Sequence, residues 1–321
     1  MKNLRKHIPL WQALYHSSLI IFLIISQLTF FSCKSLVKEI DPSILPETDS
    51  KLVVACFIAP QDTVLSAKIT ETKVLIGTIG DIRDDITNAT VSLSDGTTTI
   101  SLVYNKAQGY YRALPSKLPI LTGKTYSIVV STPDGRKVSA STTVPSDVAI
   151  KEVKVDSLKS VDSQRGNSVT NTEYTVKLIW QDVVGMKNYY RGLSLFDFIY
   201  QISDPKNNKN TIFSSFSTIL DLRTIDDKDT DGQLISLSRS FQPLNNQGSS
   251  TGQNAKLIRL KTIQVGLFQT DTHYYNYHTS LRKQRENNNP FAEPVLLYTN
   301  VNGGFGCFGS YNATWQDVKL K

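Results

Sequence analysis

Short β-type runs recur at close spacing from Lys51 onward, and this spacing limits the fold more than any other feature of the chain. In the run Thr125–Ser131, alternate residues are apolar, as in a strand with one buried face. Turn sequences such as Asp95-Gly96 separate the runs, because glycine accepts the positive φ of tight turns. The runs are Leu52–Ile58, Val64–Thr70, Ala89–Leu93, Thr98–Tyr104, Tyr110–Leu114, Thr125–Ser131 and Lys137–Val144. They predict an immunoglobulin-like or transthyretin-like β-sandwich over residues 51–150.

The second half of the chain, residues 151–321, continues the β pattern with longer runs. A polar stretch, Asp156–Thr172, precedes them and is interpreted as a link between domains or as a long loop. The longer runs are Tyr174–Trp180, Tyr189–Ile202, Thr211–Leu220, Leu234–Phe241, Lys256–Phe268 and Val295–Val301. They predict a larger β-meander, either a barrel or a second sandwich, so that the chain as a whole is all-β with two domains.

One helix is expected within this second half, near residues 271–286. Asp271 or Thr270 can cap its first turn, and Tyr274 and Leu281 fall at helical spacing. Basic residues crowd its C-terminal end, where the helix macrodipole favours cations. Its aromatic residues are expected to pack on the sheet.

The first 32 residues have the pattern of a lipoprotein signal peptide. Basic residues precede an apolar run, Leu19–Phe31, that is too short to span a bilayer and ends at Ser32-Cys33. We therefore expect cleavage before Cys33 and lipid on its thiol, with residues 33–50 as a tether. An ordinary secretory signal or an uncut membrane anchor is the alternative.

The charge of the expected mature chain argues against a nucleic-acid partner. Without Lys2, Arg5 and Lys6, 32 of the 35 basic residues remain against 28 acidic ones, a net charge of about +4. These charges are interleaved along the chain, as on a solvated surface. We also expect no membrane-spanning helix after the leader.

Two further cysteines, Cys56 and Cys307, lie far apart in the sequence and outside any metal-binding spacing. Cys56 lies in an apolar run and Cys307 in a glycine-rich one. Two separate buried thiols are the favoured interpretation, and a disulfide between them is the alternative in an exported protein.

Catalytic motifs are sparse. After the leader the only histidines are His273 and His278, whose spacing does not suit a metal pair on one helix face. The string Gly304–Gly309 resembles a dinucleotide-binding loop but has no following helix, so its glycines are interpreted as a bulge, a bend or a close backbone approach. We therefore predict a chain that is not an enzyme and that needs no cofactor, with calcium as the possible exception.

Three alternate carboxylates, Asp227, Asp229 and Asp231, precede Gly232 in a sequence that resembles the first half of a calcium-binding loop. Carboxylates around a tight turn can converge on a hard cation. The twelfth position of such a loop is Ser238 in place of the usual glutamate, so an acidic surface turn without metal is the alternative.

Two short sequences, Asp156-Ser157-Leu158 and Asp62-Thr63-Val64, resemble the O-glycosylation sites of exported Bacteroidetes proteins. Ser157 and Thr63 are the candidate acceptors. Ser157 is the better one, because it lies in the polar stretch and a glycan needs an exposed hydroxyl.

An ordered set of strings along the chain resembles a family of Bacteroidetes lipoproteins known as domain of unknown function 4249. The set includes Cys33 with Glu39-Ile40-Asp41, Lys51–Val54, Asn88–Leu93, Gly109–Tyr111, Gly123–Tyr126, Asp134–Arg136, Val144-Pro145, Tyr189–Arg191, Pro290–Pro294 and Asn300–Gly309. The chain departs from the family pattern at Cys56, where glycine is commoner, and in its phenylalanine-rich signal end.

The resemblance implies an accessory protein of the outer membrane, held by its lipid, that associates with a TonB-dependent transporter in nutrient capture or uptake. It carries no catalytic residues over to this chain. A structural or adhesive cell-surface lipoprotein is the alternative function. Whether the protein faces the periplasm or the cell surface stays open.

Overall fold

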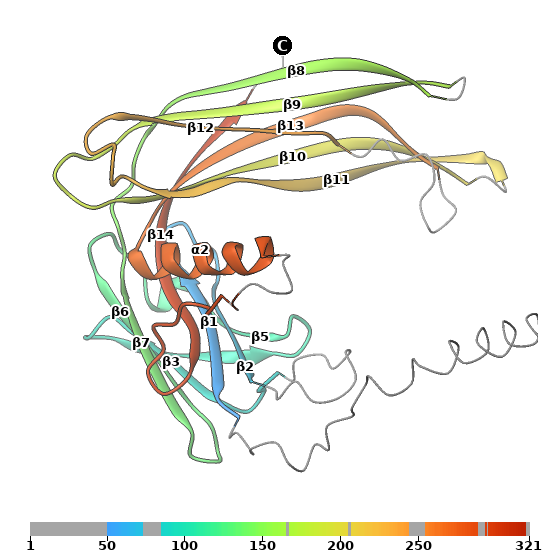
Figure 1. The fold of residues 1–321 in the computed structure, drawn as a ribbon. Helices are drawn as coiled ribbons and strands as arrows, with labels where there is room; N and C mark the ends of the chain where they lie inside the picture. Colours follow the sequence, from blue (N-terminus) through green and yellow to red (C-terminus); the bar gives the residue numbers. More distant parts are fainter. Residues whose placement is uncertain are drawn as a thin grey trace, which may run out of the picture. The chain divides into compact units, whose positions relative to one another are not determined.

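The computed structural model describes residues 50–72, 85–164, 167–204, 207–243, 254–287, 293 and 295–318. Cys33 and the expected tether up to residue 49 lie outside these residues. The first half is a β-sandwich with strands β1 (Leu52–Ile58), β2 (Leu65–Glu71), β3 (Thr90–Ser94), β4 (Thr99–Asn105), β5 (Tyr110–Ala113), β6 (Thr125–Ser131) and β7 (Lys137–Thr143), and a 3₁₀ turn at Pro115–Lys117 (Figure 1). These strands confirm the predicted runs.

Strand β4 joins the two layers of this sandwich. Residues 99–102 pair with β3, and residues 103–105 pair with β5. The sheet therefore turns back on itself, and alternate residues of each strand enter one core. Along β1, Leu52, Val54, Cys56 and Ile58 are all buried in that core.

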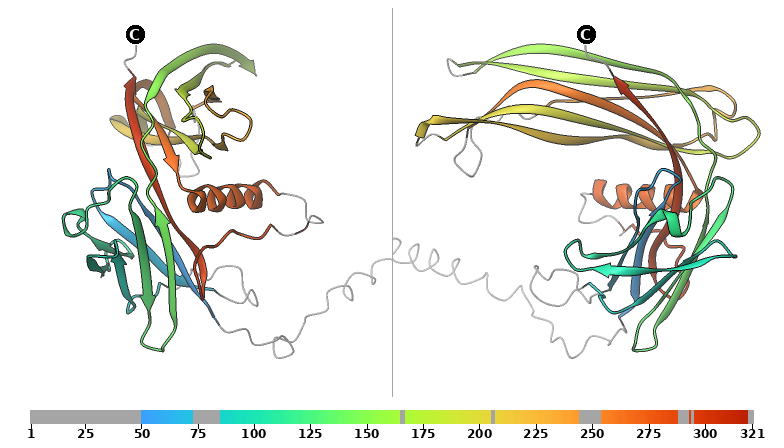
Figure 2. Two further views of the ribbon diagram at one scale, coloured as in Figure 1. Left: turned by 90° about the vertical axis from the view of Figure 1, so that its left-hand side faces the viewer. Right: turned by 180° about the vertical axis from the view of Figure 1, so that it is seen from behind.

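The second half contains β8 (Ile150–Gln164), β9 (Asn167–Gln181), β10 (Tyr189–Asp204), β11 (Asn207–Asp226), β12 (Leu234–Phe241), β13 (Asn254–Thr270) and β14 (Phe305–Val318). Strands β12, β9 and β8 form one sheet, and β11, β10, β13 and β14 belong to a second, larger sheet (Figure 2). A hydrophobic cluster that includes Trp180, Phe196 and Val265 draws residues from both sheets. Both sheets are open, so the predicted barrel is wrong and the sandwich alternative is confirmed.

The polar stretch Asp156–Thr172 is a β-hairpin, which corrects its interpretation as a linker or long loop. Its residues pair between β8 and β9 in a regular antiparallel register, for example Ser157 with Tyr174. Residues 156–160 are all exposed. Backbone hydrogen bonds without side-chain burial therefore hold residues 156–160, and a hydrophobic pattern cannot reveal such a strand segment.

Strand β14 links the two halves. Residues 305–310 pair in parallel with β1, and residues 311–318 pair antiparallel with β13, so eleven strands form one continuous sheet. The expected boundary near residue 150 therefore stays a prediction about where two domains divide. Val301 and Phe308 join the core of the first half although they come from the end of the chain.

The glycines of the 304–309 string provide the close backbone approach that was one of the expected alternatives. A Cβ atom on Gly306 would lie 2.0 Å from the carbonyl oxygen of Val54, on the paired strand β1. Gly306 also has a φ of 102°, which other residues rarely adopt. Only glycine fits this position between two strands.

The predicted helix is confirmed as α2 (Thr272–Glu286). Asp271 is its N-cap, and its carboxylate accepts a hydrogen bond of 2.7 Å from the backbone nitrogen of Tyr274. Tyr274 packs against Gly309 of β14, where an added Cβ atom would lie 3.1 Å from this tyrosine. Figure 1 shows α2 alongside β14. Within the described residues, no helix combines the length and apolar character needed to cross a bilayer.

The predicted strand Val295–Val301 is wrong: residues 295–300 form no regular secondary structure. Side chains take the place of a strand ladder there. Asn300 donates a hydrogen bond to the carbonyl of Phe308 and accepts one from its backbone nitrogen. The hydroxyl of Ser280 on α2 accepts a hydrogen bond of 3.0 Å from the nitrogen of Tyr298.

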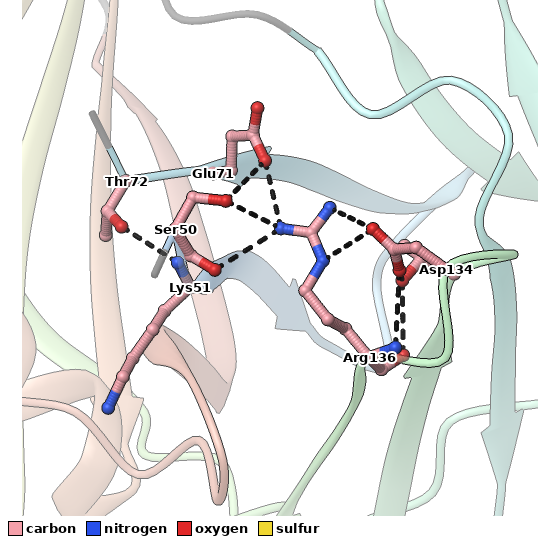
Figure 3. Close-up of polar contacts among 7 residues, drawn as sticks. Ser50, Lys51, Glu71, Thr72, Asp134 and Arg136 are labelled. Atoms are coloured by element: carbon pink, nitrogen blue, oxygen red, sulfur yellow. Dashed lines mark hydrogen bonds and ion pairs between the residues drawn. The ribbon is translucent and has the colours of Figure 1, made fainter. Parts of the chain in front are cut away.

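The start of the described chain is held by Arg136, which lies in the turn between β6 and β7 (Figure 3). Its guanidinium donates hydrogen bonds of 3.0 Å to the hydroxyl of Ser50 and 2.9 Å to the carboxylate of Glu71. It also forms an ion pair of 2.7 Å with Asp134. Beside it, Lys51 and Thr72 exchange hydrogen bonds. These contacts fix the chain immediately before β1.

Candidate functional site

Three carboxylates converge beside the turn after β11: Asp182, Asp227 and Asp231. Their oxygens lie within 4.8 Å of one another; Asp182 and Asp227 are buried and Asp231 is exposed. This grouping differs from the predicted set, because Asp229 is exposed and does not join it. Asp182 follows β9, far from the turn in the sequence, so no local pattern could have identified it.

Each of these carboxylates already accepts a hydrogen bond from the chain. The donors are the Tyr190 hydroxyl (2.6 Å) and the Gly232 nitrogen (2.7 Å) to Asp182, the Asn188 nitrogen (2.7 Å) to Asp227, and the Gly185 nitrogen (2.8 Å) to Asp231. The carboxylates therefore tie the loop between β9 and β10 to the turn between β11 and β12. These hydrogen bonds stabilise the local fold.

Calcium at this turn stays a prediction, with Asp182 in place of Asp229. Calcium takes about six to eight oxygen ligands. An ion that binds only the folded chain stabilises it, so the melting temperature should be higher in calcium than in a chelator. Asp231→Asn should abolish the increase, whereas Asp229→Asn, the matched control, should keep it. Equal melting temperatures in calcium and in chelator would leave the carboxylates with their structural role alone.

The two cysteines are free and buried, which contradicts the disulfide alternative. Ala55 is the register partner of Cys307, and Phe308 is that of Cys56. Because successive side chains point to opposite faces of a strand, the two thiols lie on opposite faces of the sheet. Burial raises the pKa of both thiols, so neither is a reactive thiolate at neutral pH.

The candidate acceptors Thr63 and Ser157 are both exposed. Thr63 lies in the turn between β1 and β2, and Ser157 lies on β8 instead of in a linker. Glycosylation at either hydroxyl stays a prediction.

The two histidines of α2 have different neighbours. The Nδ1 atom of His273 lies 2.7 Å from the hydroxyl of Tyr298. His278 instead packs its ring on Tyr274, with ring centroids 4.2 Å apart, and on Phe57. The helix therefore does not bring the two rings to one site.

A cavity of about 370 Å³ lies between α2 and the strands β11 and β12. Five arginines line it: Arg191, Arg223, Arg239, Arg282 and Arg285. Asp221 and Glu286 supply its only carboxylates among the described residues. Sequence reasoning missed this cavity, because its arginines come from β10, β11, β12 and α2. The basic end of the helix was the one available signal, and it was interpreted as a helix-dipole effect.

Arg191 organises one wall of the cavity. Its guanidinium makes a two-pronged contact with the Asp221 carboxylate, at 2.8 and 3.3 Å. It also donates a hydrogen bond of 2.7 Å to the hydroxyl of Tyr274 and lies 3.4 Å from Nδ1 of His278. The Arg191 side chain is 16% exposed, whereas that of Asp221 is 46% exposed, so water reaches the pair from the carboxylate side.

Burial and the nearby positive charge of Arg191 lower the pKa of His278 from 6.5 to about 4. The imidazole is therefore neutral at pH 7. The unfolded chain binds its proton near pH 6.5, whereas the folded chain binds it only near pH 4. The stability that this group contributes is thus present above pH 6.5 and is lost as the pH falls through about 4.

As the pH falls from 7 to 4, the free energy of unfolding of the variant His278→Phe should rise by about 3 kcal/mol relative to that of the wild type. Urea unfolding at a series of pH values measures this difference. The variant must be compared with the wild type because a second group titrates over the same range. Burial raises the pKa of Asp62 to about 6, so the contribution of Asp62 to stability increases as the pH falls. Parallel pH profiles for the two proteins would contradict the assignment.

Comparisons with known proteins identify one family. The family model described as "Domain of unknown function (DUF4249)" matches residues 37–317. No curated protein sequence matches the chain. Among solved structures, the chain is similar to "Enterococcal surface protein, partial N-terminal region" at 9% identity, over 74% of this chain and 93% of that chain, with a TM-score of 0.15. Such a low TM-score supports no conclusion about fold or function.

Proposed function

This chain belongs to the family DUF4249, and we propose that it is a lipid-anchored, non-catalytic accessory protein of the outer membrane that associates with a TonB-dependent transporter in nutrient capture or uptake. The observation that carries the proposal is the apolar run that ends at Ser32-Cys33, ahead of an all-β body. The transporter rests on the resemblance to lipoproteins encoded beside such transporters.

The start of the described chain supports the tether. Arg136 binds Ser50 and Glu71 at the point where the residues after Cys33 reach β1. A tether needs a firm attachment to the folded body, and this polar network supplies one.

A non-catalytic role is supported by how the described titratable groups are used. His273 and His278 lie in separate surroundings, and the buried carboxylates Asp182 and Asp227 accept hydrogen bonds from the chain. An acid and a base that share one reacting atom would need a different arrangement.

The test is recovery of the protein from native membranes in mild detergent, through a tag after Lys321. We expect a TonB-dependent transporter to accompany it in a fixed ratio. The matched control is Cys33→Ser, which should appear in the soluble fraction and recover less transporter. Recovery of the chain alone would overturn the transport role, and binding to glycans or host matrix would favour the adhesive alternative. Proteolysis of intact cells would decide between the two faces of the membrane.

A further inference from the structure

The arginine-lined cavity carries a large excess of positive charge. Five arginines line it, against the two carboxylate residues Asp221 and Glu286. Asp221 is already paired with Arg191. Arg223, Arg282 and Arg285 form no ion pair with any residue that the structure describes. Three cations therefore share one cavity without a partner of opposite charge.

We propose that this cavity binds a small anion whose carboxylate or phosphate oxygens accept hydrogen bonds from Arg282 and Arg285. Arginine presents its donors in a planar fork that matches both groups. The proposal goes beyond the accessory role and does not rest on it, because a protein without a transporter partner would have the same cavity.

A buried donor of Arg282 also supports anion binding, independently of the net charge of the cavity. Its Nε atom is buried and donates to no atom of the described chain. Buried donors in folded proteins almost always have a partner. An anion in the cavity would neutralise this guanidinium and accept hydrogen bonds from its donors.

The helix macrodipole does not account for the whole set. Arg285 lies in the last turn of α2, where a cation interacts favourably with the helix end. Arg223 and Arg239 come from β11 and β12 and line the same cavity. Arg239 donates a hydrogen bond of 2.5 Å to the carbonyl of Asp221, which fixes its guanidinium at the cavity wall.

The dimensions and walls of the cavity select a small ligand. Its volume of about 370 Å³ lies in the range of small-molecule sites, about 300 to 1,000 Å³. Leu222 and Leu281 supply apolar wall, and the imidazole of His278 lies beside them. The pKa of His278 is about 4, so this ring is neutral at pH 7 and adds no charge to the cavity. These features favour a compact anion with several negative oxygens over an extended polymer.

The experiment is calorimetric titration of the full chain in detergent with inorganic phosphate and, separately, with citrate. We expect one saturable site for at least one of these probes, and the stronger probe identifies the preferred oxyanion. The double variant Arg282→Gln/Arg285→Gln should lose about tenfold or more in affinity, because each charge-assisted hydrogen bond contributes strongly. The same probe should raise the melting temperature of the wild type and leave that of the variant unchanged.

The matched control is Lys151→Gln/Lys283→Gln, which removes the same charge from two exposed residues outside the cavity. It should bind the probe as the wild type does. The single variant Arg285→Gln replaces the double variant if the latter fails to fold. Absence of saturable binding by both probes, or equal binding by wild type and cavity variant, would overturn the proposal.

Discussion

Alanine at position 306 is expected to destabilise the chain by more than about 4 kcal/mol, a large part of the roughly 5–15 kcal/mol that stabilises a typical domain. The new Cβ atom would lie 2.0 Å from the carbonyl oxygen of Val54 and 2.8 Å from its carbonyl carbon. These are backbone atoms of the paired strand, so no side-chain rotation relieves the overlap. Strands β1 and β14 would have to separate, and with them the only sheet pairing between the two halves among the described strands. Circular dichroism and urea unfolding of Gly306→Ala measure the loss.

The matched control is Gly135→Ala. Gly135 has a φ of 90°, close to that of Gly306, but a Cβ atom there would meet nothing within 4 Å. This variant tests backbone strain alone, which we expect to cost about 1–2 kcal/mol. Similar losses in both variants would show that the close approach of β1 and β14 contributes nothing beyond strain.

Alanine at Trp180 is expected to lower the free energy of unfolding by about 3–5 kcal/mol. Trp180 is fully buried between the two sheets of the second half, and its ring lies 5.2 Å from that of Tyr190. Removing it leaves a void that sheet residues on both sides cannot fill, because their backbones are fixed by strand pairing. Urea unfolding followed by circular dichroism measures the change.

Trp180→Phe provides the control for this variant. The indole nitrogen of Trp180 is buried without a hydrogen-bond partner, so phenylalanine loses no hydrogen bond and keeps most of the ring contacts. We expect this variant to lose clearly less stability than Trp180→Ala. Trp315→Ala, at a residue that is 42% exposed, should likewise have the smaller effect. A loss below about 1 kcal/mol in Trp180→Ala would show that the core of the second half is loosely packed.

The sequence predicted those elements whose signal is local. Alternating burial in β1 and in Thr125–Ser131 follows from one apolar face, and the cap at Asp271 lies directly before its helix. The outer part of the hairpin formed by β8 and β9 escaped prediction, because residues 156–160 are all exposed and show no apolar face, although they pair with β9. Val295–Val301 failed for the opposite reason: its composition suits a strand, but side-chain hydroxyls accept hydrogen bonds from its backbone nitrogens at Tyr298 and Val301.

The candidate sites depended on contacts between distant residues, which a single sequence does not reveal. Asp229 was grouped with its neighbours by spacing, whereas the fold replaces it with Asp182. The cavity needs three strands and a helix to come together before its arginines form one set. The opposite orientation of Cys56 and Cys307 likewise depends on the register of β1 and β14, which the composition of the two segments does not reveal.

The position of β1 has a mechanical consequence if lipid on Cys33 holds the protein to a membrane. Force on the tether would reach the body at Ser50 and act along β1, which has β2 on one side and β14 on the other. Hydrogen bonds between strands run across the strand direction, so such a pull loads both ladders in shear and many bonds must break together. A pull across the strand direction would instead open the ladders one bond at a time. The contacts of Arg136 with Ser50 lie where such a force enters the body, and the two ladders behind them would resist unfolding.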